Sequence, residues 1–152
     1  MNDTWGRRLF HAGAILLLLI GLVHSLSLFG NPTPANETEK QLLSLMNDYH
    51  FNLVGSSRSM ANLMRGFSIS FMVAAFGFAL LDLTLRREPA QVLKRVALVN
   101  ALWLATMTAV SLRYFFVLPT SFLVAALLLF VLAWFKLPTG SEEPSRKVQA
   151  VS

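Results

Sequence analysis

The chain has no cysteine among its 152 residues, and only 14% of its residues are charged. The absence of cysteine excludes disulfides, thiolate chemistry, cysteine-ligated zinc and iron–sulfur clusters. The shortage of charge argues against an ordinary soluble domain, in which about 25% of residues are charged. Hydrophobic residues make up 55% of the chain. Because they stand in long runs, the sequence indicates a protein whose solvent is lipid.

Recognisable catalytic motifs are also missing. The sequence contains no G-x-S-x-G, no H-E-x-x-H and no P-loop. Ser25 follows His24 directly, but adjacent helical residues point in different directions, so the two do not form a dyad. We therefore predict no catalytic residues and do not favour an enzyme. The net charge of +5 comes from basic residues that flank apolar runs, so nucleic acid is not a predicted partner.

Four apolar segments are long enough to cross the hydrocarbon core, which takes about 20 helical residues. They lie at about residues 9–29, 63–85, 92–113 and 119–135. The first is interpreted as an uncleaved anchor, because its apolar run is long and no A-x-A site follows. The short connections after the second and third predict antiparallel neighbours, and hence an all-α, up-down four-helix transmembrane bundle. Pro119 fits the first turn of the fourth helix.

The distribution of Lys and Arg around the spans predicts their orientation. One side holds nine basic residues: Arg7, Arg8, Arg86, Arg87, Lys94, Arg95, Lys136, Arg146 and Lys147. The other side holds four: Lys40, Arg58, Arg65 and Arg113. We therefore predict a multi-pass protein of the cell membrane with both termini cytoplasmic. The polar tail, residues 138–152, is expected to be disordered.

The segment between the first two spans, residues 30–62, contains a helical signal. Thr38 and Gln41 have the spacing of a capping box. Apolar residues then recur at helical spacing, at Leu42, Leu45, Met46 and Tyr49. We expect a short outer amphipathic helix of about three turns. Two arrangements stay open, in which the helix lies in the membrane interface or covers the mouth of the bundle.

An ionisable residue at membrane depth, such as His24, is by default a hint of function. Arg58, Asn62 and Arg65, at the entry to the second span, are spaced 0, 4 and 7 residues along the chain, which puts them on one helical face. We expect a cationic pocket at the outer mouth of the bundle. Its candidate ligand-binding residues are His24, Tyr49, His50, Arg58, Asn62, Arg65 and Arg113.

Structural interpretations of the same residues stay open. His24 could serve as an interhelical hydrogen-bonding group, and the arginines could reach outward to lipid headgroups instead of clamping an anion. Asp82 is expected to pair with Arg86, four residues further on. Small or polar residues at about four-residue spacing predict close helix approach or homo-oligomerisation, at Asn62, Gly66, Ser70, Ala74 and Gly77.

No metal site and no cofactor are expected, because metal and haem sites need several ligands. Of the three histidines only His24 and His50 could meet, since His11 lies at the other end of its span. A bis-histidine haem between two helices, or a bound quinone, is the open alternative.

Three motifs carry a resemblance to a known family. GLVHSLSLFG, the QLLSLM segment and RSMANLMRGFSISF together resemble a family of small bacterial four-helix membrane proteins. The resemblance covers about residues 9–135. It implies the same architecture and a bacterial inner membrane, but no activity. In helix count and size the chain is also similar to DoxX-like membrane proteins, some of which are linked to quinone-dependent oxidation.

From the residues we expect a non-enzymatic membrane module. It would bind a lipid-like or anionic ligand, or a partner membrane protein, at the outer mouth of the bundle. The alternative, which the DoxX-like resemblance implies, is a redox or quinone-associated membrane subunit.

Overall fold

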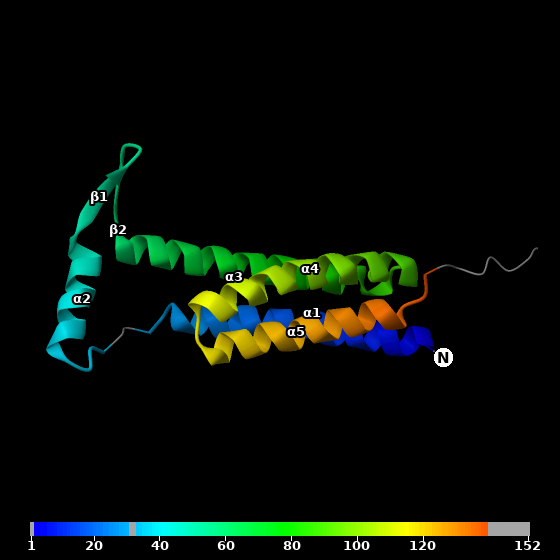
Figure 1. Ribbon diagram of the computed structural model, residues 1–152. Coiled ribbons are helices and arrows are strands. Elements are labelled where there is room, and N and C mark those ends of the chain that lie inside the picture. The colour runs from blue at the N-terminus through cyan, green and yellow to red at the C-terminus, as the bar shows by residue number, and fades with distance from the viewer. Residues whose placement is uncertain (1, 31–32, 140–152) are drawn as a thin grey trace, which may run out of the picture. The chain divides into compact units, whose positions relative to one another are not determined.

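A computed structural model describes residues 2–30 and 33–139 of the protein. Its elements in chain order are α1 (Asn2–Ser27), α2 (Glu37–Asp48), β1 (His50–Leu53), β2 (Ser56–Ser59), α3 (Met60–Thr84), the short 3₁₀ helix η1 (Leu85–Arg87), α4 (Ala90–Tyr114) and α5 (Val117–Lys136) (Figure 1). The prediction of a mostly helical fold is confirmed. The predicted disorder of the tail falls almost wholly on residues 140–152, which lie outside the described residues.

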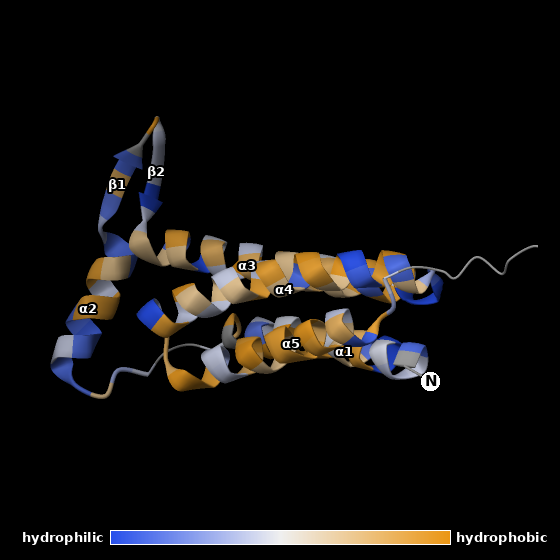
Figure 2. Ribbon diagram, turned by 45° about the vertical axis from the view of Figure 1, so that its right-hand side comes forward, coloured by the Kyte–Doolittle hydropathy of each residue, from blue (hydrophilic) through white to orange (hydrophobic). Residues whose placement is uncertain are grey.

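The four long helices α1, α3, α4 and α5 are each long and apolar enough to cross a membrane. Figure 2 shows hydrophobic colouring along α4 and α5, and hydrophilic residues where α1 begins. Four long apolar helices at the predicted positions are confirmed, but several of the helices continue into polar residues, such as those at the start of α1. Hydropathy marks only the part of a helix that lies in lipid, so the sequence placed most helix ends too far inward.

The described residues form two compact units, of which one comprises residues 2–16 and 80–139 and the other residues 17–30 and 33–79. Helices α1 and α3 each contribute to both units.

In the first unit, α4 and α5 form an antiparallel helical pair that is fastened at both ends. Ser111 and Thr120 share a hydrogen bond of 2.7 Å beside the short connection between the helices. At the opposite end, Lys94 Nζ donates a 2.8 Å hydrogen bond to the carbonyl oxygen of Leu137. Thr120 lies in the first turn of α5 with Pro119, as predicted for that proline.

The start of α1 packs against α5 in the same unit. The rings of Phe10 and Phe130, both fully buried, meet edge to face with centroids 5.6 Å apart. A Cβ at Gly13 would lie 2.9 Å from Cε2 of Phe130. Glycine is therefore needed here for the helix to approach the ring so closely.

Asp82, near the end of α3, is paired with Asn100 of α4 in the first unit. The Asn100 amide donates to Oδ1 and Oδ2 of Asp82 at 2.9 and 2.8 Å, and both side chains are buried. The prediction that Asp82 pairs with Arg86 is wrong. Because α3 ends at Thr84 and the chain tightens into η1, Arg86 lies outside the α-helical ladder, where it is exposed.

In the second unit, the rest of α1 runs antiparallel to α3. A Cβ at Gly21 would lie 3.0 Å from Cδ1 of Phe76. One turn further along α1, the ring of His24 meets that of Phe71 edge to face, with centroids 5.0 Å apart. From the first contact to the second the residue number rises in α1 and falls in α3, which shows that the two helices are antiparallel.

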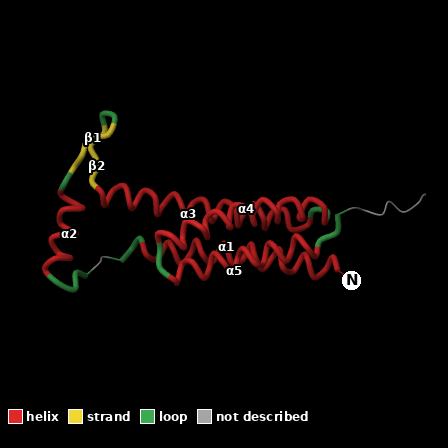
Figure 3. The backbone as a smooth tube through the Cα atoms, viewed as in Figure 1, coloured by secondary structure: helices red, strands yellow, loops and turns green. Residues whose placement is uncertain are grey.

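In the order of the chain, a helix and a β-hairpin come after α1 and before α3 (Figure 3). The helix α2 confirms the predicted amphipathic helix, but the predicted capping box is displaced. Asn36 is the N-cap and accepts a 2.9 Å hydrogen bond from the amide of Glu39, whose carboxylate accepts a 2.6 Å bond from the amide of Ala35. Asparagine is among the best N-caps, so the N-cap lies two residues before the predicted cap at Thr38.

The hairpin was not predicted. Strands β1 and β2 pair antiparallel, from His50 opposite Ser59 to Leu53 opposite Ser56. The two turn residues, Val54 and Gly55, have φ of 46° and 80°, as in the type I′ turn that suits the twist of a two-residue hairpin. Valine is rare at positive φ, so the sequence lacked the usual signal for this turn.

Candidate functional site

A groove runs beside the first turns of α3 in the second unit. Its volume is about 410 Å³, and it is lined by Arg58, Asn62, Leu63, Gly66, Phe67 and Ser70. Asn62, Gly66 and Ser70 are spaced one helical turn apart, so they form a single row along α3. A Cβ at Gly66 would meet no described atom within 4 Å. The missing side chain at Gly66 therefore helps to open the middle of the groove.

The polar groups of the groove are concentrated near the start of α3. Arg58 is the last-but-one residue of β2, and its Nη1 donates a 2.7 Å hydrogen bond to the carbonyl of Ser57. The buried Ser59 caps the helix, because its hydroxyl accepts a 3.3 Å bond from the amide of Asn62. The guanidinium of Arg58, from the hairpin, and the carboxamide of Asn62, from the first turn of α3, therefore line the same end of the groove.

Further along α3 the groove becomes more apolar. Leu63 and Phe67 flank it one turn apart, and Phe67 is exposed. Ser70 lies about 12 Å along the helix axis from Asn62, at eight residues of 1.5 Å rise. The groove can accept an anionic group at Arg58 and Asn62, and a hydrocarbon chain along Leu63 and Phe67.

The expectation that Arg58, Asn62 and Arg65 share one helical face is wrong. Helix α3 begins at Met60, so Arg58 belongs to β2. Arg58 and Asn62 still line one groove, because the strand leads directly into the helix. Arg65 is exposed on α3 and is not one of the lining residues.

Three other candidate residues lie in the second unit but do not line the groove. His24 is half-buried against Phe71. Tyr49 ends α2 as its C-cap and is exposed. His50 begins β1, where its Nδ1 lies 2.9 Å from the carbonyl oxygen of Asp48.

Arg113 belongs to the first unit, in the last turn of α4. Its guanidinium lies over the ring of the next residue, Tyr114, 5.7 Å from the ring centroid. A single pocket formed by all seven candidate residues stays a prediction.

Metal ligands do not cluster in residues 2–30 and 33–139, where no group of three or more His, Cys, Asp or Glu could hold an ion. The expectation of no cofactor stays a prediction, as does its alternative of a haem or a quinone. The sequence missed the apolar side chains of the groove, Leu63 and Phe67, because such residues are normal in any membrane helix. Gly66 was assigned to close helix approach, but a Cβ there would meet no described atom within 4 Å. In the sequence, the one signal for a groove is a glycine, Gly66, that follows the cation Arg58 at about two helical turns.

Comparison with models of known protein families, with curated proteins and with solved structures gave no match.

Proposed function

We propose that the protein is an up-down four-helix bundle in a bacterial inner membrane, with both termini cytoplasmic, and that its groove beside α3 binds an anionic amphiphile at the outer side. The antiparallel helix pairs within each unit support the up-down order. The excess of basic residues at the opposite helix ends supports the orientation. The protein acts by binding and carries out no reaction in this proposal.

The single observation that carries the proposal is that one groove is lined both by a cation and a carboxamide, where α3 begins, and by two large apolar side chains next to them. Arg58 and Asn62 offer N–H donors at the end where α3 begins, and arginine is suited to bind phosphate or carboxylate. Leu63 and Phe67 offer apolar surface beyond them. A lipid or a fatty acid has both features in the same order, whereas a soluble anion would leave the apolar part unused.

The experiment is mass spectrometry of small molecules retained by the protein after purification in mild detergent. We expect wild type to retain an acidic amphiphile. Arg58→Ala should lose it because the cation is gone. Gly66→Leu should lose it because the new side chain fills the groove, where there is open space for it.

The matched control is Arg65→Ala, which removes an exposed arginine of the same helix that does not line the groove. The control should retain the amphiphile, and all variants should keep the thermal unfolding temperature of wild type. Equal retention in all four proteins, or only bulk lipid in each, would overturn the proposal.

A further inference from the structure

Four chain segments meet at one end of the first unit, where many of its Lys and Arg residues lie. Arg7 Nη1 of α1 donates a 3.0 Å hydrogen bond to the carbonyl oxygen of Glu88, between η1 and α4. Lys94 of α4 donates to the carbonyl of Leu137, directly after α5. A Cβ at Gly6 of α1 would lie 2.9 Å from Cγ of Leu137. The start of α1, η1, the start of α4 and the end of α5 therefore lie together.

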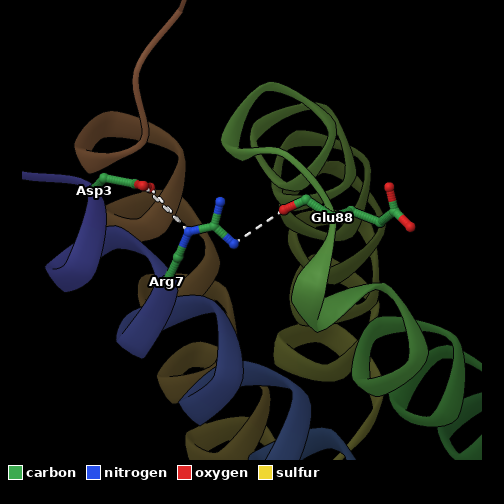
Figure 4. Close-up of polar contacts among 3 residues, drawn as sticks. All are labelled: Asp3, Arg7 and Glu88. Atoms are coloured by element: carbon green, nitrogen blue, oxygen red, sulfur yellow. Dashed lines mark hydrogen bonds and ion pairs between the residues drawn. The ribbon is translucent and has the colours of Figure 1, made fainter.

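Two cations of this end are used inside the unit. Figure 4 shows Arg7 between Asp3 and Glu88, with its Nε 3.1 Å from Oδ1 of Asp3 and its Nη1 bonded to the Glu88 carbonyl. Lys94 is bonded to Leu137, and its Nζ lies 5.6 Å from the ring centroid of Trp134. These two side chains fasten the helix ends to one another.

Five further cations of this end are exposed, and we call them the basic end: Arg8, Arg86, Arg87, Arg95 and Lys136. The ion pairs of the described residues join Arg7 to Asp3 and Lys40 to Glu37, and neither includes a residue of the basic end. The positive charge of the five residues of the basic end is therefore available to an external anion.

Exposed aromatic rings stand at the same level as these cations. Trp5, in the first turn of α1, is 54% exposed, and Phe135, next to Lys136, is 67% exposed. Tryptophan favours the boundary between hydrocarbon and headgroups. Each of these segments is the end of a helix that is long and apolar enough to cross a membrane, so in a membrane-spanning arrangement the cations would lie at headgroup depth.

We propose that the basic end binds the phosphate groups of anionic phospholipids in the membrane leaflet that it faces. Cations clustered beside a membrane helix attract acidic lipids within a Debye length of the surface. Arginine, which supplies four of the five cations, binds phosphate through two parallel N–H groups. This proposal does not rest on the groove beside α3.

The test is to reconstitute the full chain in vesicles of phosphatidylcholine and phosphatidylglycerol, extract it in polymer nanodiscs, and measure the phosphatidylglycerol enrichment around the protein. The test variant is Arg86→Gln with Arg87→Gln. The control is Arg65→Gln with Arg113→Gln, which removes the same charge from exposed arginines outside the basic end.

We expect wild type and the control to enrich phosphatidylglycerol over the bulk membrane. The test variant should lower this enrichment on the order of ten-fold, and high salt should lower it in wild type. Absence of enrichment in wild type, as for a surface that binds an acidic protein segment instead, would overturn the proposal. An equal loss in test and control variants would also overturn it.

Discussion

Asn100 donates its side-chain amide to both carboxylate oxygens of Asp82, at 2.9 and 2.8 Å, from α4 to α3. Asp82 is fully buried and Asn100 is 1% exposed. Polar residues inside membrane helices are costly unless they find partners of this kind. The pair therefore fixes how α4 returns along the end of α3, because a shift along either helix would leave both groups unsatisfied.

Removing one partner of this pair should destabilise the protein more than removing both. Asn100→Leu leaves the Asp82 carboxyl without its donor, so we expect a loss of about 1–3 kcal/mol in the free energy of unfolding. Asp82→Leu combined with Asn100→Leu should lose less than the sum of the single variants. Denaturant titration in detergent measures all three. Strict additivity would contradict a direct interaction between the two side chains.

The close approach of α1 to α5 at Gly13 should be sensitive to a single methyl group. Gly13→Ala would place a Cβ 2.9 Å from the buried ring of Phe130, and we expect a loss of about 1–3 kcal/mol. Gly77→Ala is the control, since a Cβ there meets no described atom within 4 Å. The control should be neutral or slightly stabilising, because alanine is a better helix former. If the two variants unfold at the same temperature, α1 and α5 do not pack as described.

The N-cap of α2 should be Asn36 and not Thr38. Asn36→Ala removes the acceptor of the Glu39 amide hydrogen bond, so α2 should lose about 1 kcal/mol of local stability. Amide hydrogen exchange over residues 37–48 measures this directly. Thr38→Ala should leave exchange in the helix nearly unchanged, and a larger effect at Thr38 would restore the capping box that the sequence predicted.

The long helices could be predicted from the sequence because lipid selects for apolar length, which is a local property of the chain. The partners of individual polar residues could not be predicted in the same way. Asp82 has Arg86 at a favourable spacing in the sequence, but the change from α-helix to 3₁₀ helix after Thr84 places them in different elements. Its true partner, Asn100, is 18 residues away, and only the packing of α3 against α4 selects it.

Two of the residues that line the groove could be predicted from local charge, but the element that positions one of them could not. Charge at the start of the second span identified Arg58 and Asn62, which do line the groove. The hairpin before them was missed because Val54 occupies a turn position that asparagine or glycine usually fills. Without the hairpin, the spacing predicted that Arg58 is helical and that Arg65 lies on the same helical face.

The orientation in the membrane is the central claim, because it decides to which side the groove and the basic end belong. The chain has no native cysteine, so single cysteines report their location without background. Val54→Cys lies in the exposed hairpin turn, Val117→Cys at the exposed start of α5, and Glu88→Cys between η1 and α4.

The measurement is labelling of these three variants in intact spheroplasts with a thiol reagent that cannot cross membranes. We expect Val54→Cys and Val117→Cys to react at once, and Glu88→Cys to react only after the membrane is permeabilised. Immediate labelling of Glu88→Cys, with protection of the other two variants, would contradict the orientation and would place the groove on the cytoplasmic side.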